Sequence, residues 1–294
     1  MMPQTDTIGA LNRVSIVEMA ARDGLQNEKV LIDTAAKIRL VDMLSACGFE
    51  RIEVTSFVSP KWVPQLADAA EVMAGIARRP GMRYTALTPN MKGFEAALAA
   101  GADEVAIFAS ASEGFSQHNI NCSIAESIER FRPVAQAAGQ HGIPMRGYVS
   151  CVVECPYDGA IAPVSAADVA AQLMELGCYE ISLGDTIGRG TPEAVDRMLT
   201  AVLAAIPAFK LAGHFHDTSG QALDNIGVAL ERGLRVFDAS VGGLGGCPYA
   251  PGAKGNVDTL VVDRYLKARG FETGLVEDAL EKAADFARGL RSSG

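Results

Sequence analysis

Residues 211–233 read LAGHFHDTSGQALDNIGVALERG, and this stretch shows the unit that repeats along the chain. It opens with a short apolar run, Leu211–His216, that is typical of a buried strand. Apolar residues then recur at helical spacing over Gln221–Glu231, and Gly233 stands where a glycine commonly ends a helix. The stretch is therefore predicted to form one strand followed by one helix.

The same unit recurs on both sides of this stretch, eight times in all. The predicted strands are Arg13–Met19, Arg51–Ser56, Arg83–Leu87, Glu104–Phe108, Met145–Cys151, Tyr179–Leu183, Leu211–His216 and Val236–Val241. The predicted helices are Thr34–Cys47, Ala67–Ala77, Met91–Ala99, Ile124–Gln140, Ala166–Leu176, Pro192–Ala205, Gln221–Glu231 and Val257–Ala268. Helix-end signals support these boundaries: Thr191 before Pro192 as an N-cap, and glycines at 48, 101, 142, 177 and 233 as C-terminal caps.

Eight strand–helix units in this order match a TIM (β/α)8 barrel, an α/β fold. An open doubly wound sheet also alternates strands and helices. The count of eight units and the absence of a G-x-G-x-x-G motif after the first strand favour the barrel over that fold. We expect a single domain over residues 1–294, with the barrel at about 13–268 and an additional C-terminal helical extension at 272–294.

Composition narrows the class of partner. The chain has 294 residues, 49% of them hydrophobic, and a net charge of −9, which argues against binding to nucleic acid or to an anionic membrane. No apolar run reaches the ~18 residues of a membrane span, and the first residues lack signal or transit features. The six cysteines show no disulfide-framework spacing, so we expect a reducing, cytoplasmic location.

Polar residues gather where the predicted strands end, which is where TIM barrels carry their chemistry. His214 and His216 are two apart on one strand, so their imidazoles share a face and are predicted to point into the barrel. A divalent metal is a partner that two such imidazoles can share. The alternative is two core histidines with separate hydrogen-bond partners.

Oxygen ligands are available beside this pair. Asp23 follows the first strand and Asn256 follows the last, which gives a mixed nitrogen and oxygen set that suits Mg²⁺ or Mn²⁺ better than a closed zinc site. Asn256 taken alone is equally typical of a turn. Four protein ligands would leave two octahedral positions for substrate oxygens.

Three further charged residues are predicted to face the same mouth, one after the first strand, one within the second and one at the end of the sixth. Arg22 adjoins Asp23 and is suited to stabilising a developing oxyanion, or else to a structural salt bridge. Glu53 and Asp185 are predicted inward carboxylates, suited to proton transfer or to pairing with Arg22.

The stretch from Val241 to Asp258, VGGLGGCPYAPGAKGNVD, places Cys247 among six glycines. Such a density of glycine indicates positive φ angles or a close approach of the backbone to a ligand. A free thiol on this loop is predicted to take part in chemistry.

The motifs together resemble the 3-hydroxy-3-methylglutaryl-CoA lyases of the DRE-TIM metallolyase family. The resemblance runs from about Val14 to Gly274 and rests on ARDGLQNE, EVTSFVSPKWVPQ, LTPNMKGFEAA, NINCSI, RGYVSC, GCYEISLGDTIG and GLGGCPYA. The D-G-x-Q and H-x-H elements are shared with condensing synthases such as isopropylmalate synthase. The cysteine-bearing glycine loop is more specific to the lyases.

The resemblance implies a role for each candidate. The metal ligands would be Asp23, His214, His216 and Asn256, and the catalytic residues would be Arg22 at the substrate carbonyl, Glu53, Asp185 in relay of the hydroxyl proton, His214 and Cys247. It implies cleavage of an acyl-CoA thioester to acetyl-CoA and acetoacetate, as in leucine and ketone-body metabolism, by a homodimer that uses Mg²⁺ or Mn²⁺.

Two positions depart from the family pattern. Leu260 stands where an acidic residue is usual, and Ser219 stands where close relatives often carry tyrosine. These departures leave open a sister lyase acting on citramalyl-CoA or isohexenylglutaryl-CoA. A condensing synthase usually carries a longer C-terminal extension. A catalytically inactive scaffold barrel is the alternative from another functional class.

Overall fold

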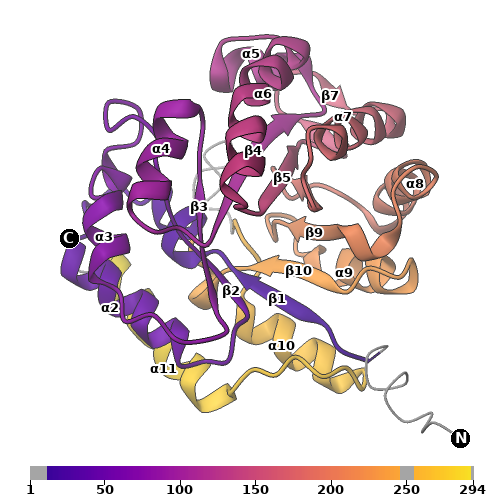
Figure 1. The fold of residues 1–294 in the computed structure, drawn as a ribbon. Helices are drawn as coiled ribbons and strands as arrows, with labels where there is room; N and C mark the ends of the chain where they lie inside the picture. Colours follow the sequence, from indigo (N-terminus) through magenta and orange to yellow (C-terminus); the bar gives the residue numbers. More distant parts are fainter. Residues whose placement is uncertain (1–11, 246–254, 293–294) are drawn as a thin grey trace, which may run out of the picture.

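The computed structural model describes residues 12–245 and 255–292. Eight parallel strands close into a barrel in the order β1-β10-β9-β8-β5-β4-β3-β2 (Figure 1). The strands are β1 (Ser15–Glu18), β2 (Arg51–Ser56), β3 (Arg83–Leu87), β4 (Glu104–Ser110), β5 (Met145–Ser150), β8 (Glu180–Asp185), β9 (Leu211–Phe215) and β10 (Val236–Ala239). The predicted TIM barrel is confirmed.

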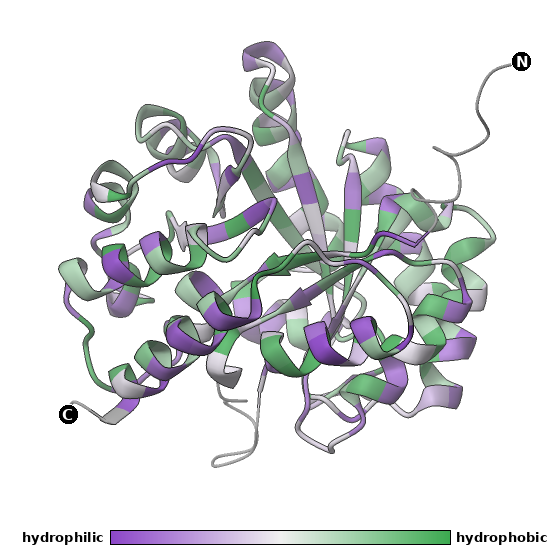
Figure 2. Ribbon diagram, turned by 90° about the horizontal axis from the view of Figure 1, so that it is seen from below, coloured by the Kyte–Doolittle hydropathy of each residue, from purple (hydrophilic) through white to green (hydrophobic). Residues whose placement is uncertain are grey.

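Helices surround the barrel. They are α2 (Thr34–Ser45), α3 (Ala69–Gly75), α4 (Met91–Ala99), α5 (Glu113–Ile120), α6 (Ile124–His141), α7 (Pro163–Glu175), α8 (Pro192–Leu203), α9 (Ala222–Glu231), α10 (Thr259–Ala268) and α11 (Glu277–Ser292). Most carry one apolar and one polar face (Figure 2). Their buried residues and the strand residues form one large core between the barrel and the helices.

The predicted helix ends agree with the observed caps. The hydroxyl of Thr191 accepts a hydrogen bond from the amide of Ala194 and so caps α8. Gly142 ends α6 with φ of 65°, and the other four predicted cap glycines also have positive φ. Local sequence therefore sets where these helices stop.

Several short elements were not predicted. Helix α5 follows β4, a small hairpin of β6 (Glu154–Cys155) and β7 (Gly159–Ala160) follows β5, and the turns η1 (Ala20–Gly24), η2 (Pro64–Leu66), η3 (Ala208–Lys210) and η4 (Val241–Gly243) link other elements. Each is too short to show a clear hydrophobic period. The first two extend the loops that rise from the carboxyl ends of the strands.

The interior of the barrel contains a ladder of buried charges. Arg51 of β2 pairs with Glu180 of β8 at 2.8 Å, Glu180 pairs with Arg146 of β5 at 2.7 Å, and Arg146 pairs with Asp238 of β10 at 2.7 Å. All four side chains are buried. Because a buried charge is tolerated only when paired, these strands depend on one another for charge balance.

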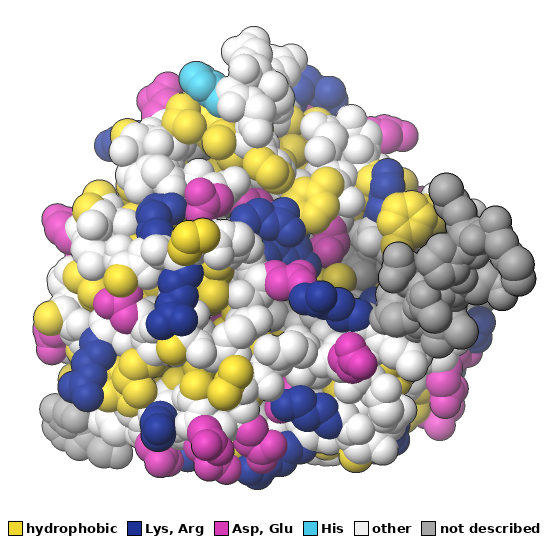
Figure 3. Space-filling model, turned by 60° about the horizontal axis from the view of Figure 1, so that its bottom comes forward, with side chains coloured by type: hydrophobic (Ala, Val, Ile, Leu, Met, Phe, Trp, Pro, Cys, Tyr) yellow, Lys and Arg dark blue, Asp and Glu magenta, His cyan; other side chains and the backbone are white. Residues whose placement is uncertain are grey.

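The predicted C-terminal helix is present as α11, which lies beside α2 (Figure 1) and also packs against η4. On the face shown in Figure 3, acidic and basic side chains are intermixed. Among the described residues, no helix has the length and apolar character required to cross a membrane.

Glu18 connects β1 to the segments on either side of the glycine loop. Its buried carboxylate accepts hydrogen bonds from the amides of Ala20 and Val241, both at 2.9 Å, and from the hydroxyl of Thr259 at 2.7 Å. Burial raises the pKa of Glu18 to about 7.

This raised pKa predicts a stability that depends on pH. The unfolded glutamate has a pKa of ~4.3, so the folded protein holds the proton more tightly, and this stabilisation is present at low pH and is lost as pH rises towards 7. Chemical denaturation should show the stability of wild type relative to Glu18→Gln falling by about 2–3 kcal/mol between pH 4.5 and pH 8. The exposed Glu95→Gln serves as control. A difference between wild type and Glu18→Gln that does not change with pH would contradict the account.

Candidate metal and catalytic site

Three of the predicted ligands meet at the mouth of the barrel. The Nε2 atoms of His214 and His216 lie 3.2 Å apart, and each is 3.9 Å from Oδ2 of Asp23. His214 comes from β9, His216 follows it, and Asp23 comes from η1. The H-x-H spacing therefore does place both imidazoles on one side of the strand, as predicted.

Asn256 joins the same group. Its amide nitrogen is 2.7 Å from Oδ2 of Asp23, and its backbone bridges to His216. Asn256 is buried, although it lies in the loop between β10 and α10. All four predicted ligands thus come together from η1, β9 and the segment before α10.

The group fits a divalent cation. Burial acts to raise the pKa of Asp23, but Arg22 and the two histidines outweigh it and hold that pKa well below its ordinary value. Nδ1 of His214 lies 3.1 Å from the buried carboxylate of Asp238, so its Nε2 is left facing Asp23 and His216. A carboxylate and two imidazole nitrogens that converge in this way can ligate one divalent metal ion, and a carboxylate behind a ligand histidine commonly orients that histidine.

Two glycines allow these loops to approach each other. A Cβ on Gly24 would lie 2.8 Å from both Leu244 Cβ and Ser240 Oγ. Gly245 has φ of 100°, and a Cβ there would lie 2.6 Å from the amide nitrogen of Asn256. The wide turn of η1 and the start of the glycine loop can therefore lie in contact only with glycine at these positions.

Arg22 is both ion-paired and adjacent to the cluster. Its Nε is 2.5 Å from Oε2 of Glu53, and its Nη1 is 2.5 Å from Oδ1 of Asp23. Burial is the main cause that raises the pKa of Glu53, and Arg22 opposes it. The two predicted alternatives for Arg22, salt bridge and substrate contact, are thus compatible, because the salt bridge fixes the guanidinium beside the cluster.

Asp185 lies beside the cluster but its carboxylate contacts another loop. The carboxylate accepts hydrogen bonds from the amides of Gly190 at 2.8 Å and Arg189 at 3.3 Å, while its backbone carbonyl accepts one from His216. Burial raises the pKa of Asp185. Backbone amides therefore hold this carboxyl group in place, and its raised pKa means that it takes up a proton more readily than an ordinary aspartate does.

Cys247 lies outside the described residues. The residues that precede it enter the loop through η4, where Gly242 and Gly243 have positive φ. On the far side of the undescribed residues 246–254, Asp258 caps α10 by accepting hydrogen bonds from the amides of Leu260 and Val261. Of the departures from the family pattern, Ser219 is exposed after β9, and Leu260 lies in the first turn of α10 and packs against the core.

The sequence alone missed the residues behind the cluster. Tyr148 donates a hydrogen bond to Glu53 at 3.1 Å and accepts one from Arg146 at 2.9 Å. Arg146 in turn holds Asp238, which contacts His214. Each of these is a single polar residue at an inward position of a strand, which was the available signal, but only the closed barrel brings them together.

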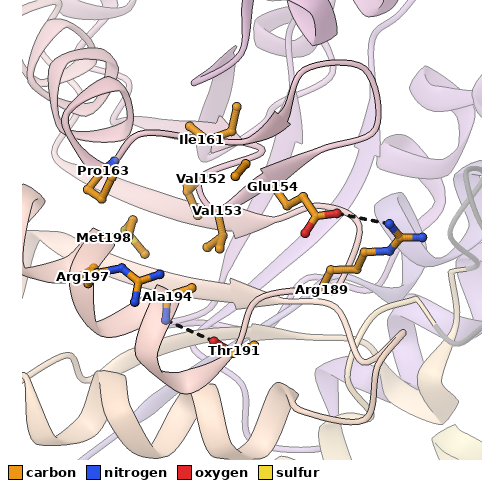
Figure 4. A pocket seen from close by; sticks show the side chains of 11 residues that line it. Val152, Val153, Glu154, Ile161, Pro163, Arg189, Thr191, Ala194, Arg197 and Met198 are labelled. Atoms are coloured by element: carbon orange, nitrogen blue, oxygen red, sulfur yellow. Dashed lines mark hydrogen bonds and ion pairs between the residues drawn. The ribbon is translucent and has the colours of Figure 1, made fainter.

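A separate cavity of about 270 Å³ lies between the β6–β7 hairpin and the start of α8 (Figure 4). Its lining includes Val152, Ile161 and Met198, and an ion pair between Arg189 and Glu154 lies at its edge. None of the predicted site residues lines it, so it is distinct from the cluster.

Known proteins are similar to this chain in both sequence and fold. A family model described as HMGL-like matches residues 13–287. The chain belongs to the HMGL-like family.

Members of the HMGL-like family are similar to this chain over nearly its whole length. The 3-hydroxy-3-isohexenylglutaryl-CoA/hydroxymethylglutaryl-CoA lyase of Pseudomonas aeruginosa is 59% identical over 92% of this chain and 90% of its own. The mitochondrial hydroxymethylglutaryl-CoA lyase of Rattus norvegicus is 56% identical over 96% of this chain and 87% of its own. The crystal structure of the HMG-CoA lyase from Brucella melitensis superposes with a TM-score of 0.95 and 67% identity, over 96% of this chain and 100% of that one.

The close packing at Gly245 predicts an effect on metal binding. Gly245→Ala combines an unfavourable φ with a contact that displaces the side chain of Asn256, so Mn²⁺ affinity should fall by about tenfold or more. Gly270→Ala is the matched control, because Gly270 has φ of 82° and open space around it. Both variants should lose about 1 kcal/mol of stability, measured by denaturation. Equal Mn²⁺ affinity in the two variants would contradict the role given to Asn256.

Proposed function

We propose that this protein is a divalent-metal-dependent carbon–carbon lyase that cleaves 3-hydroxy-3-methylglutaryl-CoA to acetyl-CoA and acetoacetate. The observation that carries the proposal is the convergence of Asp23, His214 and His216 beside Arg22, in a chain of the HMGL-like family. The names of its relatives support the choice of substrate.

The reaction is a retro-Claisen cleavage. The substrate carries a tertiary hydroxyl at C3 and a thioester at C1. When bound, Mg²⁺ or Mn²⁺ supplies Lewis acidity that makes the hydroxyl proton easier to remove. Asp185, whose pKa is raised by burial, takes that proton, and the C2–C3 bond breaks with its electron pair moving towards the thioester. The C3 side becomes acetoacetate.

Arg22 and Cys247 act on the other product. Arg22 donates hydrogen bonds to the thioester oxygen, where negative charge develops, and Glu53 holds the guanidinium in that orientation. Cys247 then donates a proton to C2, which completes acetyl-CoA. The ligands in this proposal are Asp23, His214, His216 and Asn256, with the first three already grouped closely.

The finer assignments are also proposals. We infer Mg²⁺ or Mn²⁺ from the mixed nitrogen and oxygen donors. A cytoplasmic location is supported by the free cysteines of the described residues, whereas the rat relative is a mitochondrial protein. We infer a homodimer from the family resemblance, and a single domain from the eight successive strand–helix units without an intervening linker. Isohexenylglutaryl-CoA is the second candidate substrate, because the Pseudomonas relative is named for both compounds.

The deciding experiment is product analysis of wild type and Cys247→Ala with Mg²⁺. Wild type should release acetoacetate from 3-hydroxy-3-methylglutaryl-CoA, and EDTA should abolish release. Cys247→Ala should bind Mn²⁺ normally but turn over about 10²–10⁴-fold more slowly, since a positioned proton donor contributes that much. The buried Cys178→Ala controls for loss of a thiol and should keep its activity.

Each outcome separates the alternatives. Release of product only from citramalyl-CoA or isohexenylglutaryl-CoA would replace the substrate assignment. Turnover of Cys247→Ala at the wild-type rate would remove the thiol from the mechanism. No turnover of any thioester by a protein that binds Mn²⁺ would favour the inactive scaffold.

A further inference from the structure

The carboxylate of Asp238 is surrounded by hydrogen-bond donors. Its Oδ1 lies 2.7 Å from Nη2 of Arg146, and its Oδ2 lies 3.1 Å from Nη1 of Arg146 and 2.7 Å from the hydroxyl of Ser182. Nδ1 of His214 approaches the same Oδ2 at 3.1 Å. The side chain is completely buried. Asp238 is therefore a buried hydrogen-bond acceptor whose carboxylate faces one imidazole nitrogen, Nδ1 of His214.

This arrangement indicates which nitrogen of His214 carries a proton. Both oxygens of Asp238 already face donors, Oδ1 the Nη2 of Arg146 and Oδ2 the Nη1 of Arg146 and the hydroxyl of Ser182, so this ion-paired carboxylate accepts hydrogen bonds. Nδ1 of His214 must then donate. A neutral imidazole has one N–H, so Nε2 presents its lone pair towards Asp23 and His216.

The second histidine lacks such support. Nδ1 of His216 is buried and has no hydrogen-bond partner among the described residues. Its Nε2 lies opposite that of His214 at 3.2 Å. The two imidazoles are thus not equivalent, although the H-x-H motif presents them as a pair.

We propose that Asp238 is a positioning residue of the metal site, which fixes His214 as the Nδ1–H tautomer so that Nε2 is available to a divalent cation. Arg146 holds Asp238 in this role through two hydrogen bonds. This inference rests on the proposed function, because it matters that Nε2 of His214 is free only if the reaction requires a metal.

Arg146 also connects this support to the substrate side of the site. Its Nη1 donates to the hydroxyl of Tyr148, which donates to Glu53, and Glu53 pairs with Arg22. Arg22 then contacts Asp23, the ligand that faces His214. One closed circuit of contacts therefore joins both sides of the cluster, with Arg146 at its base.

The first test measures the tautomer in the metal-free wild type. Two-bond ¹H–¹⁵N spectra of protein labelled at histidine distinguish Nδ1–H from Nε2–H, and the chain has only four histidines, so His214→Gln identifies the signal. His214 should be protonated at Nδ1. Protonation at Nε2 would overturn the proposal, and this measurement needs no variant of Asp238.

The second test measures Mn²⁺ affinity by calorimetry. Removing Asp238 alone would leave the buried ladder of Arg51, Glu180 and Arg146 with one excess positive charge, so Arg146 and Asp238 are replaced together as Arg146→Met with Asp238→Val. Mn²⁺ should bind about 10–100-fold more weakly, the usual effect of losing an outer carboxylate. Ser182→Ala is the matched control, because it removes a hydrogen bond to the same oxygen but does not contact His214, and its effect should be far smaller.

The outcomes distinguish this proposal from the function it rests on. If the folded double variant binds Mn²⁺ as tightly as Ser182→Ala while wild type cleaves the thioester, Asp238 has no positioning role and the lyase function stands. If wild type shows the Nδ1–H tautomer and weakened Mn²⁺ binding follows the double substitution, yet no thioester is cleaved, the positioning role stands and the proposed reaction fails. If the double variant does not fold, the wild-type tautomer decides.

Discussion

The buried ion pair between Arg146 and Asp238 is the interaction on which the site depends. An isolated charge inside the barrel would be strongly unfavourable, so each of these residues requires the other. Glu180 also pairs with Arg146 and balances the charge of Arg51. These ion pairs thus connect strands β2, β5, β8 and β10 inside the barrel, and Asp238 connects them to His214 of the metal cluster.

One arginine also pairs with two carboxylates at the mouth of the barrel. The Nε of Arg22 contacts Glu53 and its Nη1 contacts Asp23, so one guanidinium orients a carboxylate on the substrate side and another on the metal side. Gly24 and Gly245 then let η1 and the glycine loop approach closely enough for Asp23 to reach Asn256. These two ion pairs fix the orientation of the Arg22 guanidinium, and a fixed donor is what strong electrostatic stabilisation of a developing charge requires.

Sequence patterns predicted the barrel because hydrophobic periodicity repeats eight times, and they found His214 and His216 because spacing along one strand is local information. They missed Arg146, Tyr148 and Asp238, since these act through contacts across the barrel that depend on register. Short elements such as α5 and η1 escaped because they span too few residues to show a period. Asp185 was predicted correctly as a strand-end carboxylate, but its hydrogen bonds to the β8–α8 loop required coordinates.

We propose that Asp23, His214 and His216 hold one divalent cation. A crystal structure of the protein with Mn²⁺ would test this, because anomalous scattering locates the ion independently of any assay. We expect one strong peak between Oδ2 of Asp23 and the two Nε2 atoms, with Asn256 alongside. A peak elsewhere in the barrel, or none at saturating Mn²⁺, would contradict it.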